Sequence, residues 1–147
     1  MNFDKDRFLQ EFSSWHLRAR KTAFKGQNGL RELLTFIEAD DDWTDLRQVA
    51  YFLGTVYHEA AGTFKPIKEF RAKEGTVARK VQDKYWFTEK FGRGYVQITH
   101  KANYQRLGAR LNIALDENPD LALEPIYAYE SQQWECAKDC LLAQNYQ

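Results

Sequence analysis

Two glutamates, Glu59 and Glu69, stand on either side of a predicted helix end. Apolar residues recur at helical spacing up to Glu59, and Gly62 and Pro66 then end the helix and turn the chain. Carboxyl groups on two different elements can face each other across a groove, where one donates a proton and the other accepts one from water. A gap of about 6.5–9.5 Å leaves room for that water, whereas about 5 Å implies a covalent route. The chemistry indicated is hydrolysis of a glycosidic bond.

Glu59 is the stronger candidate for the general acid. On the expected helix it borders the apolar stripe, and both the negative end of the helix dipole and the nearby apolar surface disfavour the ionised carboxylate. A general acid working near neutral pH needs that environment. The base has several candidates, because Glu74 and Glu89 lie within reach as well as Glu69. A lone glutamate at a helix end is more often an ordinary surface residue, so the assignment depends on its context.

A third segment, residues 92–99, reads Gly-Arg-Gly-Tyr-Val-Gln-Ile-Thr. Its glycines allow the backbone to approach a ligand closely. Gln97 and Thr99 alternate with apolar residues, which predicts a strand that presents both polar groups on one face. Asn103 follows in the first turn of the next expected helix. A glycine-framed bend before a strand is common, so this run is weak evidence by itself.

The elements that must position these residues are mostly helices, since apolar residues recur at helical spacing over most of the chain. The third helix is the clearest, with its N-cap at Thr44. From residue 65 to 91 polar residues dominate, which favours short strands or a mobile loop over a helix. The expected helices begin near Phe3, Asn28, Thr44, Thr99, Pro119 and Pro125. The prediction is a mainly α-helical domain with a small β or irregular excursion near its middle.

Size and charge narrow the function classes. The 147 residues, 44% of them hydrophobic, suit one domain over residues 1–147. Lys+Arg and Asp+Glu both number 21, so no overall charge recruits nucleic acid or an anionic membrane. The stretch from Lys65 to Lys84 is nevertheless net basic. Such a run is usually a solvated face, and the alternative is the rim of a cleft for an anionic polymer.

Neither a metal nor a cofactor is expected. Cys136 and Cys140 lie four apart in a predicted helix, which favours reduced thiols on one apolar face over a disulfide framework. The three histidines are scattered without zinc-type spacing. The N-terminus lacks a signal-peptide pattern and no apolar run approaches membrane-spanning length. The expectation is synthesis in the cytoplasm without a signal peptide and without stable membrane insertion.

Together these segments resemble the family 19 glycoside hydrolases, which are chitinases and phage-type endolysins of lysozyme-like fold. The resemblance covers about residues 48–123. It rests on four stretches in the family's order: His58-Glu59 with Pro66-Ile67-Lys68-Glu69, then residues 92–99, Asn103-Tyr104 and Asn118-Pro119-Asp120-Leu121.

The resemblance implies that Glu59 is the general acid and Glu69 the general base. It implies that Thr99 helps to hold the attacking water, and that Gln97 and Asn103 hydrogen-bond the sugar and its N-acetyl group. His58 would orient the acid or, equally, bond to backbone at the helix end. The predicted substrate-binding residues are His58, Arg93, Gln97, Thr99, Asn103 and Tyr104, with Trp86 added because the three consecutive aromatic residues 85–87 cannot all face inward.

The chain departs from the family pattern at three points. Ala60 stands where the family usually has Thr or Ser after the His-Glu pair, so a hydrogen bond near the acid is missing. The two glutamates are ten residues apart, whereas many members have nine, which weakens the case for Glu69 against Glu74. Many members also continue beyond the position of Gln147, so a C-terminally truncated domain is one expectation.

The preferred substrate from sequence is bacterial peptidoglycan, cleaved in its β-1,4 glycan backbone by an inverting mechanism. The net basic stretch would suit its anionic peptide stems. Action on the cell wall would then follow release or delivery by an export helper, either a holin of a phage endolysin or the secretion system of an interbacterial toxin. The alternatives are a chitinase acting on β-1,4 N-acetylglucosamine polymers, a non-catalytic glycan-binding module, and a helical interaction protein whose aromatic residues are core.

Overall fold

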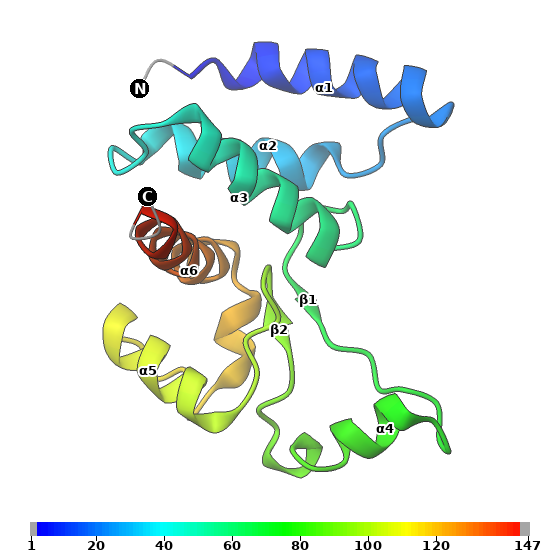
Figure 1. Ribbon diagram of the computed structural model, residues 1–147, viewed down its shortest axis with the longest axis vertical. Helices are drawn as coiled ribbons and strands as arrows, with labels where there is room; N and C mark the ends of the chain where they lie inside the picture. Colours follow the sequence, from blue (N-terminus) through cyan, green and yellow to red (C-terminus); the bar gives the residue numbers. More distant parts are fainter. Residues whose placement is uncertain (1–2, 145–147) are drawn as a thin grey trace. The chain divides into compact units, whose positions relative to one another are not determined.

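The computed structural model describes residues 3–144, and side chains up to Trp134. The chain is mainly helical with a two-stranded sheet near its middle, which confirms the predicted fold class (Figure 1). The helices are α1 (Lys5–Arg20), α2 (Gln27–Ala39), α3 (Leu46–Glu59), α4 (Val77–Gln82), α5 (Lys101–Leu111) and α6 (Pro125–Gln144), with the 3-10 helices η1 (Trp86–Thr88) and η2 (Pro119–Leu123). Strands β1 (Ile67–Lys68) and β2 (Arg93–Gly94) pair antiparallel, with Ile67 opposite Gly94.

The chain divides into two compact units. The first comprises the residues up to Lys65 and those from Gln132 onward, and the second runs from Pro66 to Ser131. Glu59 therefore belongs to the first unit and Glu69 to the second. The single domain expected over the whole chain stays a prediction.

The first unit has its core on α2 and α3. Leucines and an isoleucine recur at helical spacing on α2 and are at most 1% exposed, and α3 buries Phe52 and Val56 completely. Gly29 allows α2 to approach the loop after α3, because a Cβ there would lie 2.5 Å from the carbonyl oxygen of Thr63. This packing fixes the helix that carries Glu59 at its end.

The N-cap residues expected for two helices, Thr44 and Thr99, are each wrong by one position. Helix α3 begins after Asp45, not Thr44, because the Asp45 carboxylate accepts a hydrogen bond from the Arg47 N–H at 2.8 Å. Helix α5 begins after His100, whose φ of 72° turns the chain, and Thr99 does not cap it. The two helix starts predicted from prolines are confirmed, since η2 begins at Pro119 and α6 begins at Pro125.

The polar stretch from residue 65 to 91 contains more helix than expected. Besides β1 it folds into α4 and η1, and the Thr76 hydroxyl caps α4 by accepting from the Arg79 N–H at 3.2 Å. Six residues complete fewer than two helical turns, which is too short for apolar periodicity to show. The preference for strands or a mobile loop was therefore only half right.

Two other expectations concern membrane insertion and the two cysteines. Within residues 3–144 none of the helices is both long and apolar enough to cross a bilayer. Cys136 and Cys140 lie in α6, as predicted, but their side chains lie outside the described part of the structure, so their reduced state stays a prediction.

Candidate active site

Glu59 is the last residue of α3, and its side chain is exposed, as is that of His58. The next residue, Ala60, is fully buried, and the chain then turns through Gly62 at a φ of 72°. The N–H of Gly62 closes the helix end by donating to the carbonyl of Tyr57 at 2.8 Å. A carboxyl group in this position points away from the core of its unit and can meet a ligand.

Glu69 follows β1 and has a different environment. Its Oε1 accepts hydrogen bonds from the Tyr85 hydroxyl at 2.7 Å and from the Gln82 Nε2 at 2.9 Å. Its Oε2 accepts one from the N–H of Gly92 at 2.7 Å, and the Glu69 N–H donates to the Gly92 carbonyl at 2.7 Å. The pairing of β1 with β2 thus continues for one more residue pair and fixes the carboxylate beside Gly92.

These contacts keep the Glu69 carboxylate ionised. Partial burial would by itself raise the pKa of Glu69, but the hydrogen bonds from Gly92, Tyr85 and Gln82, with a smaller contribution from the charge of His100, hold that pKa below its ordinary value. The same environment acts oppositely on the phenol, since burial and the Glu69 carboxylate raise the pKa of Tyr85 to about 12. An ionised carboxylate at neutral pH is able to accept a proton from water.

The two other candidates for the base are placed differently. Glu74 is exposed in the turn before α4, and Glu89 is exposed at a φ of 58°. In the described part of the chain, Glu69 is the one of the three whose carboxylate receives side-chain hydrogen bonds. The geometry favours Glu69 as base, and the assignment of both glutamates stays a prediction.

The segment after β2 is a tight turn and not the strand that alternation predicted. Arg93 and Ile98 face each other in a single bridge, with the Ile98 N–H donating to the Arg93 carbonyl at 2.8 Å. Gln97 lies within this turn at a φ of 53°. Alternation of polar and apolar residues over so few positions does not distinguish a strand from a turn closed by one bridge.

This turn still brings the predicted polar residues together. The Gln97 Nε2 donates to the Ile67 carbonyl at 3.3 Å, and the Thr99 hydroxyl donates to the Gln97 carbonyl at 2.7 Å. Asn103, in the first turn of α5 as predicted, donates from Nδ2 to the Thr99 carbonyl at 2.8 Å. Because its one proton is used, the Thr99 hydroxyl can offer its lone pairs to a water molecule.

Gly92 is the point where Glu69 and Gln97 meet. A Cβ built at residue 92 would lie 2.5 Å from the Gln97 Oε1 and 3.2 Å from the Glu69 Cβ. The absence of a side chain therefore permits both residues to pack against the same backbone atoms. This explains in physical terms why a glycine stands first in the 92–99 motif.

Gly92→Ala is expected to displace the Gln97 carboxamide and to tilt the Glu69 side chain. The control is Gly54→Ala, because Gly54 is exposed and a Cβ there would meet nothing within 4 Å. We expect a loss of about 1–3 kcal/mol in the free energy of unfolding from overpacking, measured by urea denaturation. The turnover rate should fall by a larger factor than the fraction of folded protein does. Unchanged stability and turnover in Gly92→Ala would contradict the close packing described.

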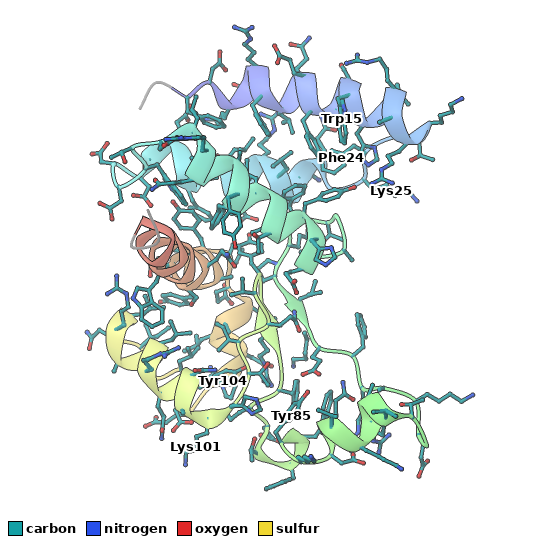
Figure 2. All side chains as sticks on the ribbon, in the orientation of Figure 1. Trp15, Phe24, Lys25, Tyr85, Lys101 and Tyr104 are labelled. Carbon is teal, nitrogen blue, oxygen red and sulfur yellow. The ribbon has the colours of Figure 1, made fainter. Side chains whose placement is uncertain are left out.

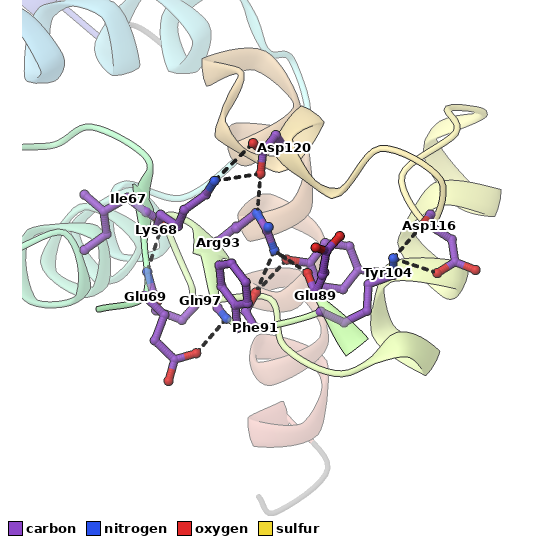
Figure 3. Close-up of polar contacts among 12 residues, drawn as sticks. Ile67, Lys68, Glu69, Glu89, Phe91, Arg93, Gln97, Tyr104, Asp116 and Asp120 are labelled. Carbon is purple, nitrogen blue, oxygen red and sulfur yellow. Dashed lines mark hydrogen bonds and ion pairs between the residues drawn. The ribbon is translucent and has the colours of Figure 1, made fainter. Parts of the chain in front are cut away.

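Residues 93–98, which are β2, the turn and the bridged Ile98, form a small hairpin. The side chains of Arg93 and Tyr104 form a buried hydrogen-bonded network that supports this hairpin (Figure 3). The Arg93 side chain is 5% exposed, and its Nε donates to the Asp120 carboxylate at 2.6 Å. Its Nη1 donates to the carbonyls of Glu89 and Phe91 and to the Tyr104 hydroxyl. Both residues were predicted to bind substrate, but their burial means that any such contribution is made through the hairpin that they support.

Asp120→Asn tests the network. Burial alone would raise the pKa of Asp120, but hydrogen bonds and charge from Lys68 and Arg93 hold it below its ordinary value of 3.8. The carboxylate contributes stability above pH 3.8 that is lost as the pH falls through its lower folded value. We expect Asp120→Asn to destabilise by about 1 kcal/mol at pH 7, because the amide still accepts a hydrogen bond. Thermal melting should show the difference shrinking below pH 3.8.

Trp86 stacks on Phe91, with ring centroids 4.3 Å apart, and the Arg71 guanidinium lies 4.8 Å from the centroid of the same indole. A sugar stacking on Trp86 would therefore have to displace Arg71. The neighbouring Phe70 and Phe87 are 85% and 78% exposed. Sequence reasoning missed Phe70, although its place next to Glu69 was a signal that could have identified it.

The sequence matches known proteins over most of its length. The profile of a family described as "Chitinase class I" matches residues 24–139, which excludes α1. The chain is 32% identical over 110 residues to an acidic 26 kDa endochitinase of Solanum lycopersicum, covering 67% of this chain and 38% of that protein. It is 33% identical over 99 residues to chitinase 11 of Oryza sativa subsp. japonica, covering 64% and 37%.

A crystal structure of a chitinase C mutant is similar, with 27% identity and a TM-score of 0.48 over 89% of this chain and 64% of that one. The chain spans less than two fifths of the length of the two curated relatives named above.

Proposed function

Because the chain belongs to the chitinase class I family, we propose that it is a glycoside hydrolase that cleaves β-1,4-linked polymers of N-acetylglucosamine. The observation that carries the proposal is the Glu69 carboxylate, which three hydrogen bonds hold in its ionised form beside Gln97. The names of the endochitinase relatives support chitin as the polymer. Exposed aromatic side chains such as Phe70 suit the apolar faces of sugar rings.

In the proposed reaction Glu59 protonates the glycosidic oxygen as the bond to the anomeric carbon breaks. Glu69 takes a proton from a water molecule, whose oxygen forms the new bond from the opposite face of the sugar. The Thr99 hydroxyl would hold that water, and Gln97 and Asn103 would bind the sugar and its N-acetyl group. Glu59 ends ionised and Glu69 protonated, and exchange with solvent restores both. The product has the inverted anomeric configuration.

Peptidoglycan is the second candidate, and the distribution of charge favours it. In the basic stretch, Arg71 and Arg79 pair with Asp83, and Lys68 pairs with Asp120. Four further lysines of this stretch are exposed: Lys65, Lys73, Lys80 and Lys84. Anionic peptide stems would be attracted to them, and salt would weaken that attraction.

One experiment separates the two substrates. Purified protein is incubated with chitin oligomers and with isolated peptidoglycan at low and high salt, and the released ends are identified by mass spectrometry. We expect cleavage of chitin oligomers that depends little on salt. Salt-sensitive release of muropeptides, reduced by replacing the four exposed lysines with glutamine, would favour peptidoglycan instead.

Failure to cleave either polymer, with binding retained, would overturn the hydrolase proposal in favour of a glycan-binding module. A folded protein that neither cleaves nor binds them would favour the helical interaction protein.

A further inference from the structure

Gln82, the last residue of α4, is 7% exposed, and both the oxygen and the nitrogen of its carboxamide are hydrogen-bonded. Its Oε1 accepts from the N–H of Ala72 at 2.7 Å, which fixes the orientation of the amide. Its Nε2 then donates to the Phe70 carbonyl and to the Glu69 Oε1, both at 2.9 Å. One side chain thus ties α4 to the segment that carries the proposed base.

Tyr85 adds a second donor to the same oxygen of Glu69. Its hydroxyl lies 2.7 Å from Oε1, and its ring packs edge-on against His100 with centroids 5.1 Å apart. Tyr85 comes from the segment between α4 and η1 (Figure 2). The phenol is therefore held by its ring as well as by its hydrogen bond.

The two oxygens of Glu69 consequently differ. A carboxylate oxygen has two lone pairs, and both lone pairs of Oε1 are used by Gln82 and Tyr85. Oε2 receives one hydrogen bond, from the Gly92 N–H, and retains one lone pair. The next acceptor for a proton is therefore Oε2.

We propose that Gln82 and Tyr85 are positioning residues that occupy Oε1 of Glu69 and so make Oε2 the atom that removes the proton from the attacking water. This inference rests on the proposed function and extends it to two residues outside the motifs that suggested it. Neither residue touches the reacting atoms in this scheme. Each acts by orienting Glu69 and by favouring its ionised form.

The loss of a hydrogen-bond donor to Glu69 should change the pH dependence of the reaction. The titratable groups that face Glu69 among the described residues are Tyr85, His100 and Tyr104. Burial raises the pKa of Glu69 and the donors lower it, so removing a donor to Oε1 raises that pKa. A general base with a higher pKa is protonated at a higher pH. The acid limb of the profile of kcat/KM against pH should then move upward.

The test compares Tyr85→Phe and Gln82→Met with wild type, and with Tyr127→Phe as a control in the same unit. Tyr85→Phe keeps the ring that packs on His100 and removes only the donor. We expect the midpoint of the acid limb of kcat/KM in Tyr85→Phe to move up by about one pH unit. The midpoint of the Glu69 side-chain carboxyl titration, followed by NMR, should move by the same amount. The plateau value of kcat/KM should be about tenfold lower. Tyr127→Phe should change none of these.

If Tyr85→Phe is folded and active, and neither its pH profile of kcat/KM nor the titration of Glu69 changes, the positioning role of Tyr85 is overturned. If Gln82→Met fails to fold, the Tyr85→Phe profile decides by itself. If the wild-type protein hydrolyses neither polymer, the proposed function is overturned. This result is obtained before any variant is compared, so it is distinguishable from a failure of the positioning role.

Discussion

Glu59→Gln is expected to lower kcat by about 10²–10⁴-fold while leaving KM nearly unchanged. The amide has the shape of the acid but cannot transfer a proton to the leaving oxygen, so the interaction lost exists only in the transition state. Because Glu59 is exposed at the end of α3, the variant should melt at the wild-type temperature. Initial rates on chitin oligomers, beside a thermal melt, provide the measurement.

A matched control for this variant is Glu32→Gln, which changes another exposed glutamate of the first unit. It should retain full turnover. The variant Glu59→Gln should also lose the basic limb of its pH profile, since no acid remains to be deprotonated. Full activity in Glu59→Gln would remove Glu59 from the reaction, and a proton donor elsewhere would have to be sought.

The position of Glu59 was predictable because long-range periodicity is the strongest signal that a sequence offers. The apolar stripe of α3 extends over four turns, and the buried residues Val49, Phe52 and Val56 confirm it. The exact start of the helix was not predictable in this way. Thr44 and Asp45 are both good caps, and the choice depends on which side chain reaches the free N–H groups of the first turn.

The surroundings of Glu69 could not be predicted from the same signals. Gln82 gives no pattern in the sequence, and it reaches Glu69 because α4 follows a polar turn. Tyr85 was recognised as one of three consecutive aromatic residues, but a count of aromatics does not say which one supplies a hydroxyl to a carboxylate. Contacts between residues 13 and 16 positions apart, on either side of a turn, require the tertiary fold.

The motif around Arg93 shows a related limit. A short motif identifies residues that occur together, but it does not separate those that face a ligand from those that support them. Arg93 and Tyr104 were both predicted to contact substrate, and the structure places both in the interior of the hairpin network. A charged side chain that is 5% exposed and has four hydrogen-bond acceptors is satisfied within its own unit.

Glu69→Ala is expected to lower kcat by about 10²–10⁴-fold, because no group then removes the proton from the attacking water. The shortened side chain also leaves space beside Gly92, Gln82 and Tyr85, where the carboxylate was bound. Azide, a small anionic nucleophile that needs no deprotonation, should enter this space and restore part of the rate. Its product reports the stereochemistry directly.

An inverting reaction predicts that the azide attacks from the face used by water and yields an α-glycosyl azide from the β-linked substrate. Proton NMR of the product distinguishes the two anomers by their coupling constants. Glu74→Ala is the matched control, because it removes an exposed glutamate nearby in sequence and should change neither rate nor azide response. If Glu74→Ala were the variant that lost activity and recovered it with azide, Glu74 would be the base, and the donors around Glu69 would have only a structural role.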